Sequence, residues 1–455
     1  MADRLAGVAM DKRQFLKTSA ALVTGSLLSN FSSEAEQTAP RTNWAGNYTF
    51  HAREVYTPES VQDVQEIVRK HDKLKALGAR HSFNSIADTS GGQVSVEHLK
   101  DMEVDAKSRT VTVGAGVRYG QLAPYLDDHG FALHNLASLP HVSVAGACAT
   151  GTHGSGIKNG NLSTAVSRLE IVNGGGEIVT LTRQDKEFQG AVVGLGALGI
   201  ITKVTLDVQP TFQMRQVVYE NLSFDKLEHH LDEIFGAGYS VSLFTDWQNH
   251  RATQVWIKSR VTPGSSWTMP KEFFGAKAAT RNLHPLAGHS AENCTEQMGV
   301  PGPWYERMPH FRMNFTPSSG QELQSEFFVP RNRAYEAILA VEKLRDQVTP
   351  HLFITELRTI ESDSLWISTA YSRQSLAIHF TWKPEWDAVK AVLPKIEEQL
   401  QPFDARPHWA KLFTMSPSRL KMLYVRMPEF QQLARQFDPN GKFRNEFLNA
   451  NVYAA

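Results

Sequence analysis

The chain has 455 residues, enough for two or three domains with a sizeable buried core. Hydrophobic residues make up 41% of it and charged residues 21%, which is ordinary for a globular protein. Lys and Arg together number 47, as do Asp and Glu, so no net field favours binding to nucleic acid or to an anionic membrane.

The first 42 residues have the pattern of an export signal followed by a linker. The basic stretch 11–17 leads into an apolar run, 18–28, that is too short to span a bilayer. A polar stretch, 29–38, completes the order of a secretory signal. The basic stretch resembles the twin-arginine export motif, with Lys12 in place of its first arginine. We therefore expect an exported, periplasmic protein, with a cytoplasmic location as the alternative.

Residues 43–212 mix helical and strand patterns. Thr57 is typical of a helix N-cap with Pro58 at the first helical position, and apolar residues in 61–68 recur at helical spacing. The patterns that follow predict a strand at 73–77, a strand at 110–113, a helix at 119–126 and a hairpin through the turn 173–176. This mixture predicts an α+β domain and not a regular βα alternation.

Two loops in this region are rich in small residues. The loop 77–84 has the sequence LGARHSFN, and the loop 137–156 has the sequence ASLPHVSVAGACATGTHGSG. Small residues let backbone N–H groups approach a ligand closely, and hydroxyls add donors for phosphate oxygens. One such loop is more typical of a tightly packed turn, whereas two loops that each carry a histidine favour a large dinucleotide. By its chemistry alone, His81 is an ordinary loop residue, a metal ligand, a general base or the attachment point of a covalent group.

A third glycine-rich segment, GLGALG at 194–199, matches the GxGxxG pattern by letter only. The dinucleotide-binding form of that pattern needs a preceding strand and a following helix, whose N-terminus meets the pyrophosphate. Here an alternating strand pattern, 200–208, follows the glycines. The sequence therefore argues against a nicotinamide site at this segment.

The pattern changes near Pro210, and we expect a second domain over 213–405. The predicted elements are a strand at 217–219, a helix at 224–235, a strand at 240–245, an irregular segment at 263–319 and further strands and helices up to about residue 401. A C-terminal segment, 406–455, is expected to return to the first domain. Cys148 and Cys294 form no CxxC pattern, and the chain has no HExxH, so neither a disulfide framework nor a metal site is expected.

Motifs from both halves together resemble the vanillyl-alcohol-oxidase-type, or PCMH-type, FAD-binding family. They are NWAGN at 43–47, the two loops above, GLGALGIIT at 194–202, YSVSLFTDW at 239–247, NCTEQMGVPGPW at 293–304, FTPSSGQELQSE at 315–326, ELRT at 356–359, HFTW at 379–382, ARPHWAKLF at 405–413 and DPNGKFRNEF at 438–447. The later motifs point to bacterial alditol (xylitol/sorbitol) oxidases, which are near relatives of sugar-1,4-lactone oxidases. The resemblance implies an α+β fold, with a two-subdomain FAD-binding domain at 43–212 and a substrate domain built on a large antiparallel sheet flanked by helices.

The resemblance also implies FAD as the cofactor, bonded covalently from His81 to the 8α carbon of the flavin ring. The first loop is expected to wrap the pyrophosphate and the ring edge with Ala76, Leu77, Gly78, Ala79, Arg80 and Ser82. The second loop is expected to contribute Ser138, Ser143, Gly146, Thr150, Gly151, Thr152 and His153. Ile201 is expected near the adenine, and His408 beside the flavin.

The reaction implied by the resemblance is oxidation of the terminal primary hydroxyl of an alditol by hydride transfer to the flavin. Cationic donors aimed at a developing alkoxide stabilise it, and Arg358 and Lys411 are the candidates. Two close cations favour a neutral lysine, which can take the hydroxyl proton. Glu356 is assigned to catalysis together with Arg358 and Lys411. It is two residues from Arg358, and on a strand this spacing puts both side chains on one face. The expected substrate-binding residues are Ser138, Gln324, Glu356, His379 and Thr381.

Three questions stay open at this stage. O2 is the expected electron acceptor, yielding hydrogen peroxide, but Ala137 stands where relatives have a small residue that influences oxygen access, so a quinone or cytochrome remains an alternative. The main functional alternative is a sugar-1,4-lactone oxidase or dehydrogenase, and the non-enzymatic alternative is a periplasmic polyol-binding protein. The expected partners are a small polyol and an electron acceptor, with no nucleic acid, no membrane span in the mature chain, and a monomer as the expected state.

Overall fold

The structure is a computed structural model that describes residues 41–264, 266–315 and 321–454. The expected export signal falls on residues 1–40 and so lies outside the described residues, apart from the last two positions of its linker. The chain from Arg41 onward forms one compact unit. Among the helices that the structure describes, none combines the length and the apolar character needed to cross a bilayer.

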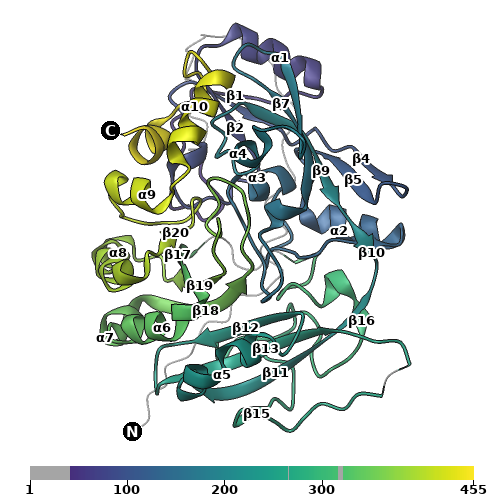
Figure 1. The fold of residues 1–455 in the computed structure, drawn as a ribbon, viewed down its shortest axis with the longest axis vertical. Helices are drawn as coiled ribbons and strands as arrows, with labels where there is room; N and C mark the ends of the chain where they lie inside the picture. Colours follow the sequence, from purple (N-terminus) through teal and green to yellow (C-terminus); the bar gives the residue numbers. More distant parts are fainter. Residues whose placement is uncertain (1–40, 265, 316–320, 455) are drawn as a thin grey trace, which may run out of the picture. The chain divides into compact units, whose positions relative to one another are not determined.

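The N-terminal half contains two main sheets (Figure 1). A parallel three-stranded sheet has the order β1 (Glu54–Tyr56), β3 (Gly92–Ser95), β2 (Leu74–Leu77). An antiparallel five-stranded sheet has the order β4 (Met102–Asp105), β5 (Thr110–Gly114), β9 (Ile200–Asp207), β7 (Val166–Val172), β8 (Ile178–Thr182). The strands β6 (Phe131–Ala132) and β10 (Gln209–Pro210) form a short separate pair. The helices of this half are α1 (Val61–Lys70), α2 (Tyr119–Asp128), α3 (Val144–Ala149) and α4 (Phe188–Ala191).

Most elements predicted in this half are present within a few residues of their expected bounds. The predicted hairpin is confirmed, because β7 and β8 pair antiparallel around the turn 173–176. The predicted start of α1 is wrong. Ser60, and not Thr57, is the N-cap: its hydroxyl accepts a hydrogen bond from the Asp63 backbone at 3.1 Å, and the Asp63 carboxylate accepts one from the Ser60 backbone at 3.0 Å. This reciprocal capping box places Pro58 before the helix.

The chain beyond residue 212 forms a ten-stranded antiparallel sheet. Its order is β14 (Glu272–Phe273), β15 (Ala276–Ala278), β11 (Gln213–Ser223), β13 (Arg251–Arg260), β12 (Ser240–Thr245), β18 (Leu352–Ile360), β19 (Ser375–Trp382), β17 (Leu323–Pro330), β20 (Arg406–Pro407), with β16 (Gly302–Pro303) paired beside β11. The expected large antiparallel sheet is therefore confirmed. The strand predicted at 217–219 is the middle of the longer β11.

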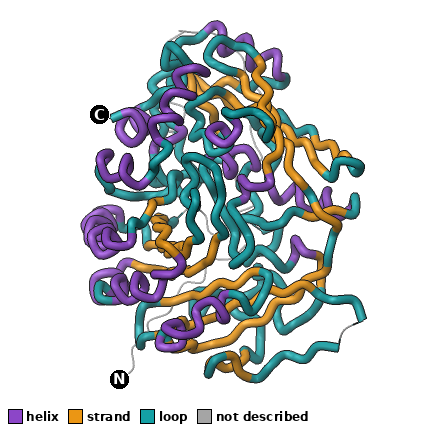
Figure 2. The backbone as a smooth tube through the Cα atoms, in the orientation of Figure 1, coloured by secondary structure: helices purple, strands orange, loops and turns teal. Residues whose placement is uncertain are grey.

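One face of the large sheet is covered by helices (Figures 1 and 2). They are α5 (Asp225–Phe235), α6 (Ala334–Glu342) with the short α7 (Arg345–Val348) after it, and α8 (Trp386–Leu400). Their apolar side chains share one core with inward residues of the sheet such as Leu357, Ile378 and Phe327. Alternate residues of a strand point to opposite faces. The neighbours of these core residues, Glu356 and His379 among them, therefore lie on the face away from the helices.

The C-terminal segment packs against the N-terminal half. It carries α9 (Pro417–Leu423), α10 (Met427–Phe437) and α11 (Glu446–Leu448). The backbone N–H of Leu74 donates to Lys442 O at 3.0 Å, and the Asn445 side-chain amide donates to three carbonyl oxygens between Ser85 and Asp88. These bonds link the end of the chain to the strand and loop that precede and follow His81.

Candidate active site

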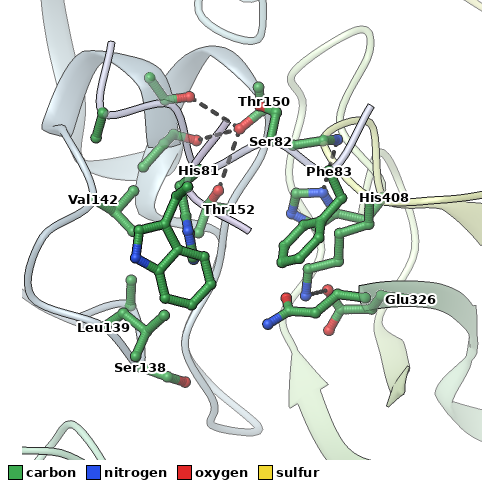
Figure 3. A pocket seen from close by; sticks show the side chains of 18 of the residues that line it. His81, Ser82, Phe83, Ser138, Leu139, Val142, Thr150, Thr152, Glu326 and His408 are labelled. Atoms are coloured by element: carbon green, nitrogen blue, oxygen red, sulfur yellow. Dashed lines mark hydrogen bonds and ion pairs between the residues drawn. The ribbon is translucent and has the colours of Figure 1, made fainter. Parts of the chain in front are cut away.

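A cavity of about 590 Å³ lies between the N-terminal sheets and the free face of the large sheet. In Figure 3, His81, Ser138, Thr150 and Thr152 lie on one side of it, and Glu326 and His408 on the other. The cavity brings together most of the residues predicted from the sequence: Ala76, Gly78, Ala79, Arg80, His81, Ser82, Ser138, Ser143, Gly146, Thr150, Thr152, His153, Ile201, Gln324, Glu356, Arg358, His379, Thr381, His408 and Lys411.

Two predicted cofactor residues do not line the cavity. Leu77 is the last residue of β2, where it pairs with Ser95, and its side chain is buried; its neighbours Ala76 and Gly78 are the ones that line the cavity. Gly151 has a left-handed backbone, with φ of 68°, between Thr150 and Thr152, which both line the cavity. The contiguous stretches expected from the motifs are therefore interrupted at a buried strand residue in the first loop and at a left-handed glycine in the second.

His81 follows β2 in a tight loop whose preceding residue, Arg80, has φ of 60°. Its ring packs edge-on against Trp44, with centroids 4.4 Å apart, and against His141 at 4.8 Å. Burial, with added repulsion from His141, Lys411 and His379, holds the pKa of His81 well below its usual value. Its Nδ1 is buried and has no hydrogen-bond partner among the described residues. His81 lines the cavity as a neutral ring, and a neutral imidazole nitrogen without a proton suits a nucleophile or an acceptor.

The two small-residue loops meet at Ser143. A Cβ added to Gly78 would lie 2.8 Å from Ser143 Oγ, and one added to Gly146 would lie 2.7 Å from the same atom. Within the second loop, the Thr150 hydroxyl donates to Gly146 O at 3.0 Å and lies 3.3 Å from the Thr152 hydroxyl (Figure 3). Glycine at these two positions leaves room for the Ser143 hydroxyl, and the result is a wall with little side-chain bulk.

The GLGALG segment forms another part of the wall, although the sequence reasoning had assigned only the nearby Ile201 to the cofactor site. Leu195, Gly196 and Gly199 line the cavity, and β9 follows directly, so the context of a nicotinamide site is absent as expected. The buried Lys75 ammonium donates to Leu195 O at 3.2 Å and Gly196 O at 2.9 Å, and burial lowers the pKa of Lys75 to about 7. Gly199 has φ of 146°, which other residues rarely adopt, and a Cβ there would lie 2.2 Å from Val172 O, so the position requires glycine.

On the opposite side, three neighbouring strands present a row of polar side chains. Glu356 of β18 is paired with His379 of β19, and His379 is paired with Glu326 of β17. Gln324 and Thr381 are likewise paired one step along the same strands. Residues in register across a sheet share a face. The row therefore explains why motifs far apart in the sequence meet in one site.

Glu326 is the main residue of this side that the sequence reasoning missed. Its carboxylate, 1% exposed, accepts hydrogen bonds from Arg358 Nη2 at 3.0 Å and Lys411 Nζ at 2.7 Å, and lies 3.1 Å from His153 Nε2. Burial raises the pKa of Glu326, but Lys411, His153 and Arg358 outweigh burial and hold it well below its usual value. Arg358 and Lys411 are thus brought together by a shared counter-charge. Glu326 is two residues after Gln324 in a strand pattern, which places both side chains on one face, and this spacing could have revealed Glu326 from the sequence.

Arg358 donates hydrogen bonds to two acceptors and lies near a third. Besides Glu326, its Nη1 donates to Ser138 Oγ at 3.3 Å, and its Nε lies 3.5 Å from Glu356 Oε2. Burial lowers the pKa of Arg358, but the two carboxylates outweigh burial and raise it. Burial lowers the pKa of Lys411, and the Arg358 charge adds to this effect although Glu326 opposes it. The two cations therefore differ: Arg358 stays charged, whereas Lys411 is the one that can lose its proton.

His379 lies beside these charges as a neutral ring. Burial, together with the Lys411 charge, lowers the pKa of His379 to about 4. Both of its ring nitrogens are buried, and neither has a hydrogen-bond partner in the part of the chain that the structure describes. With Gln324, Thr381 and Glu356, His379 supplies donors and acceptors for several hydroxyl groups. This set can bind a polyhydroxylated molecule and stabilise an alkoxide under Arg358 and Lys411.

The family model described as "FAD binding domain" matches residues 52–182, and the model described as "D-arabinono-1,4-lactone oxidase" matches residues 316–451. The chain is 46% identical over 411 residues to an alditol oxidase of Streptomyces sp., covering 90% of this chain and 97% of that protein. It is 26% identical to an L-gulono-1,4-lactone dehydrogenase of Mycobacterium tuberculosis, covering 89% and 97% of the two chains. In fold it is similar to a cholesterol oxidase from B. sterolicum, with a TM-score of 0.71 at 15% identity, covering 91% and 96%.

Proposed function

The chain belongs to the family of FAD-dependent oxidoreductases that contains the Streptomyces alditol oxidase, and we propose on this premise that it oxidises the terminal primary hydroxyl of an alditol to the aldose. The family and the PCMH-type fold predicted from the sequence are confirmed, and the cofactor is FAD. The observation that carries the proposal is the pair Arg358 and Lys411, held by Glu326 in the same cavity as His81. The substrate class is a small polyol such as xylitol or sorbitol.

The residues present fit FAD. The loops around Ser143 leave a wall that extra side-chain atoms would obstruct, and three separate glycine-bearing segments contribute to it. The unpaired Nδ1 of His81 is a suitable point of attachment, since it is neutral and buried. When bound, FAD supplies the hydride acceptor. We infer that the flavin is attached covalently at His81, which a protein-bound fluorescence after acid precipitation would test.

The chain's own residues divide the remaining work. Arg358 stays cationic and stabilises negative charge on the substrate oxygen, while Lys411, with its lowered pKa, takes the hydroxyl proton at Nζ. Glu356, Gln324 and His379 orient the other hydroxyls from the face of the large sheet. Burial of all these groups excludes water, which strengthens their electrostatic effect on the reacting oxygen.

A second candidate function is oxidation of a sugar-1,4-lactone, favoured by the family match over residues 316–451. Parallel turnover of xylitol and an aldonolactone, each measured with O2 and with a dye acceptor, separates the possibilities. We expect faster turnover of xylitol with peroxide formed in proportion. Preference for the lactone would overturn the alditol assignment, and dye reduction without peroxide would identify a dehydrogenase. The polyol-binding alternative without catalysis is set aside, because the chain belongs to an oxidoreductase family.

We also propose that the protein is exported to the periplasm. The support is the sequence pattern of residues 11–38, with its basic, apolar and polar parts in the order of a secretory signal. Cell fractionation of the full-length chain, compared with a variant that lacks residues 1–40, tests this. Equal cytoplasmic retention of both would contradict it.

A further inference from the structure

A buried lysine and a buried histidine adjoin Glu356, and the histidine, His310, also lines the cavity. His310 Nε2 lies 2.7 Å from Glu356 Oε1, and Lys258 Nζ lies 3.0 Å from His310 Nδ1. Lys258 is 1% exposed, His310 6% and Glu356 5%, so the three form a continuous buried array. Lys258 comes from β13 and Glu356 from β18, while His310 comes from the loop that follows β16. None of the roles above uses Lys258 or His310.

The hydrogen positions in this array follow from its charges. Burial raises the pKa of Glu356, but Arg358 and His310 outweigh burial and hold it well below its usual value, so the carboxylate has no proton to donate. His310 Nε2 must therefore carry the proton of that bond. Burial, with the charge of Lys258, lowers the pKa of His310 to about 4, so the ring is neutral and its Nδ1 is an acceptor. Lys258 donates to that Nδ1 and to Met308 O.

Packing fixes the plane of the His310 ring. The rings of Trp256 and Phe244 contact it edge-on, each with centroids 5.3 Å away and interplanar angles of 90° and 70°. The backbone just before His310 is held by Thr295, whose hydroxyl donates to Pro309 O at 2.7 Å. The bond to Glu356 therefore has one available geometry and one available tautomer.

The consequence falls on the other oxygen of Glu356. Oε1 accepts from His310, whereas the contacts of Oε2 with the described residues are longer, 3.5 Å to Arg358 Nε and 3.8 Å to His379 Nδ1. These distances exceed those of good hydrogen bonds. Oε2 thus keeps acceptor capacity on the side of Arg358 and His379, which both line the cavity. A substrate hydroxyl can use that capacity.

We propose that Lys258 and His310 are positioning residues that hold the Glu356 carboxylate so that its Oε2 accepts a hydroxyl of the polyol. The proposal rests on the proposed function of the same site. The hydroxyl bound by Glu356 need not be the reacting one. Lys258 and His310 therefore affect substrate binding more than the chemical step. This is a role in recognition, exerted through Glu356 and not by contact with the reacting atoms.

The test uses the FAD-loaded enzyme and four variants: His310→Leu, His310→Gln, Glu356→Gln and the double variant His310→Leu with Glu356→Gln. Loss of a hydrogen bond that holds a buried charge predicts that His310→Leu raises KM for xylitol by about tenfold or more, with kcat changed much less. His310→Gln, whose amide can still donate to Oε1, restores most of the affinity. The double variant binds xylitol no more weakly than Glu356→Gln alone, because His310 acts through Glu356.

Thr295→Val is the matched control, since it loosens the backbone beside His310 without touching Glu356. An equal rise in KM in this control, or multiplied effects in the double variant, would overturn the proposal. A readout that needs no turnover is the ¹⁵N resonance of His310, assigned by its loss in His310→Leu. We expect the Nε2–H tautomer of His310 in wild type, and a changed ¹⁵N resonance of His310 in Lys258→Met. An Nδ1–H tautomer would refute the array even if xylitol were the wrong substrate, whereas wild-type enzyme inactive on every alditol would refute the proposed function alone.

Discussion

Replacing Arg358 by lysine separates the geometry of this cation from its charge. The guanidinium donates to Glu326 at 3.0 Å and to Ser138 at 3.3 Å, and its Nε faces Glu356 at 3.5 Å. A planar fork can reach three acceptors in different directions, whereas the single nitrogen of a lysine can hold only one such position. Arg358→Lys therefore keeps the charge but loses at least two of the three contacts.

The expected loss can be estimated from these contacts. Each hydrogen bond to a charged group contributes about 1.5–3 kcal/mol, and removal of one preorganised donor at a developing oxyanion costs about 10²–10³ in kcat. We expect kcat on xylitol to fall about 100-fold or more in Arg358→Lys. KM should change much less, since Glu356, Gln324 and His379 remain to bind the substrate hydroxyls.

The assay is steady-state turnover of xylitol together with flavin content and melting temperature, so that loss of cofactor or fold is detected separately. Arg358→Ala assayed with added guanidinium provides the complement, because a free guanidinium ion can enter the space that the side chain leaves. We expect partial recovery of kcat by guanidinium and none by ammonium. A kcat for Arg358→Lys within threefold of wild type would refute the argument that geometry, and not charge alone, stabilises the alkoxide.

Four further predictions concern the counter-charge, the flavin attachment and the glycine wall. Glu326→Gln removes a negative charge that raises the pKa of Lys411. The rising limb of kcat/KM against pH should therefore move to lower pH in this variant. A shift to higher pH would contradict the role of Lys411 as the base. In the folded state the pKa of Glu326 is below its ordinary value of 4.5. The ionised carboxylate therefore stabilises the fold above pH 4.5, and this contribution is lost as the pH falls through the folded pKa. The melting temperature should drop more steeply in acid for wild type than for Glu326→Gln. His81→Ala should release all flavin into the supernatant after acid precipitation while wild type keeps a fluorescent pellet, and free flavin from both would disprove the attachment. Gly199→Ala should lower melting temperature and flavin retention because its Cβ would lie 2.2 Å from Val172 O. Gly264→Ala, also at positive φ but with no described residue beyond its chain neighbours within 4 Å of the added Cβ, should lose much less. Equal losses would show that backbone strain alone accounts for the effect.

The parts of the site that the sequence predicted are those whose chemistry is local or repeated along a strand. The i, i+2 spacing placed Glu356 with Arg358, and His379 with Thr381, on one face of their strands, which the structure bears out. Their small residues and histidines singled out the two loops, and the resemblance supplied the attachment role of His81. The α1 cap at Ser60 was missed because Thr57 followed by proline satisfies the same preference, and the choice depends on the Asp63 side chain.

What could not be predicted depends on contacts between distant segments. Glu326 joins Arg358 and Lys411 only because β17 lies beside β19 and the C-terminal segment returns across the sheet. Lys258 reaches His310 through strand order and loop packing that no local pattern encodes. GLGALG was correctly excluded as a nicotinamide motif, yet its role as a cavity wall depends on Lys75, which is about 120 residues earlier in the chain.

The most direct measurement is anaerobic mixing of the purified yellow protein with xylitol, followed by the flavin absorption in a single turnover. Hydride transfer under Arg358 and Lys411 predicts complete bleaching by xylitol, and much slower bleaching by an aldonolactone. A flavin that stays oxidised in saturating xylitol, in protein that retains its cofactor and fold, would contradict the account.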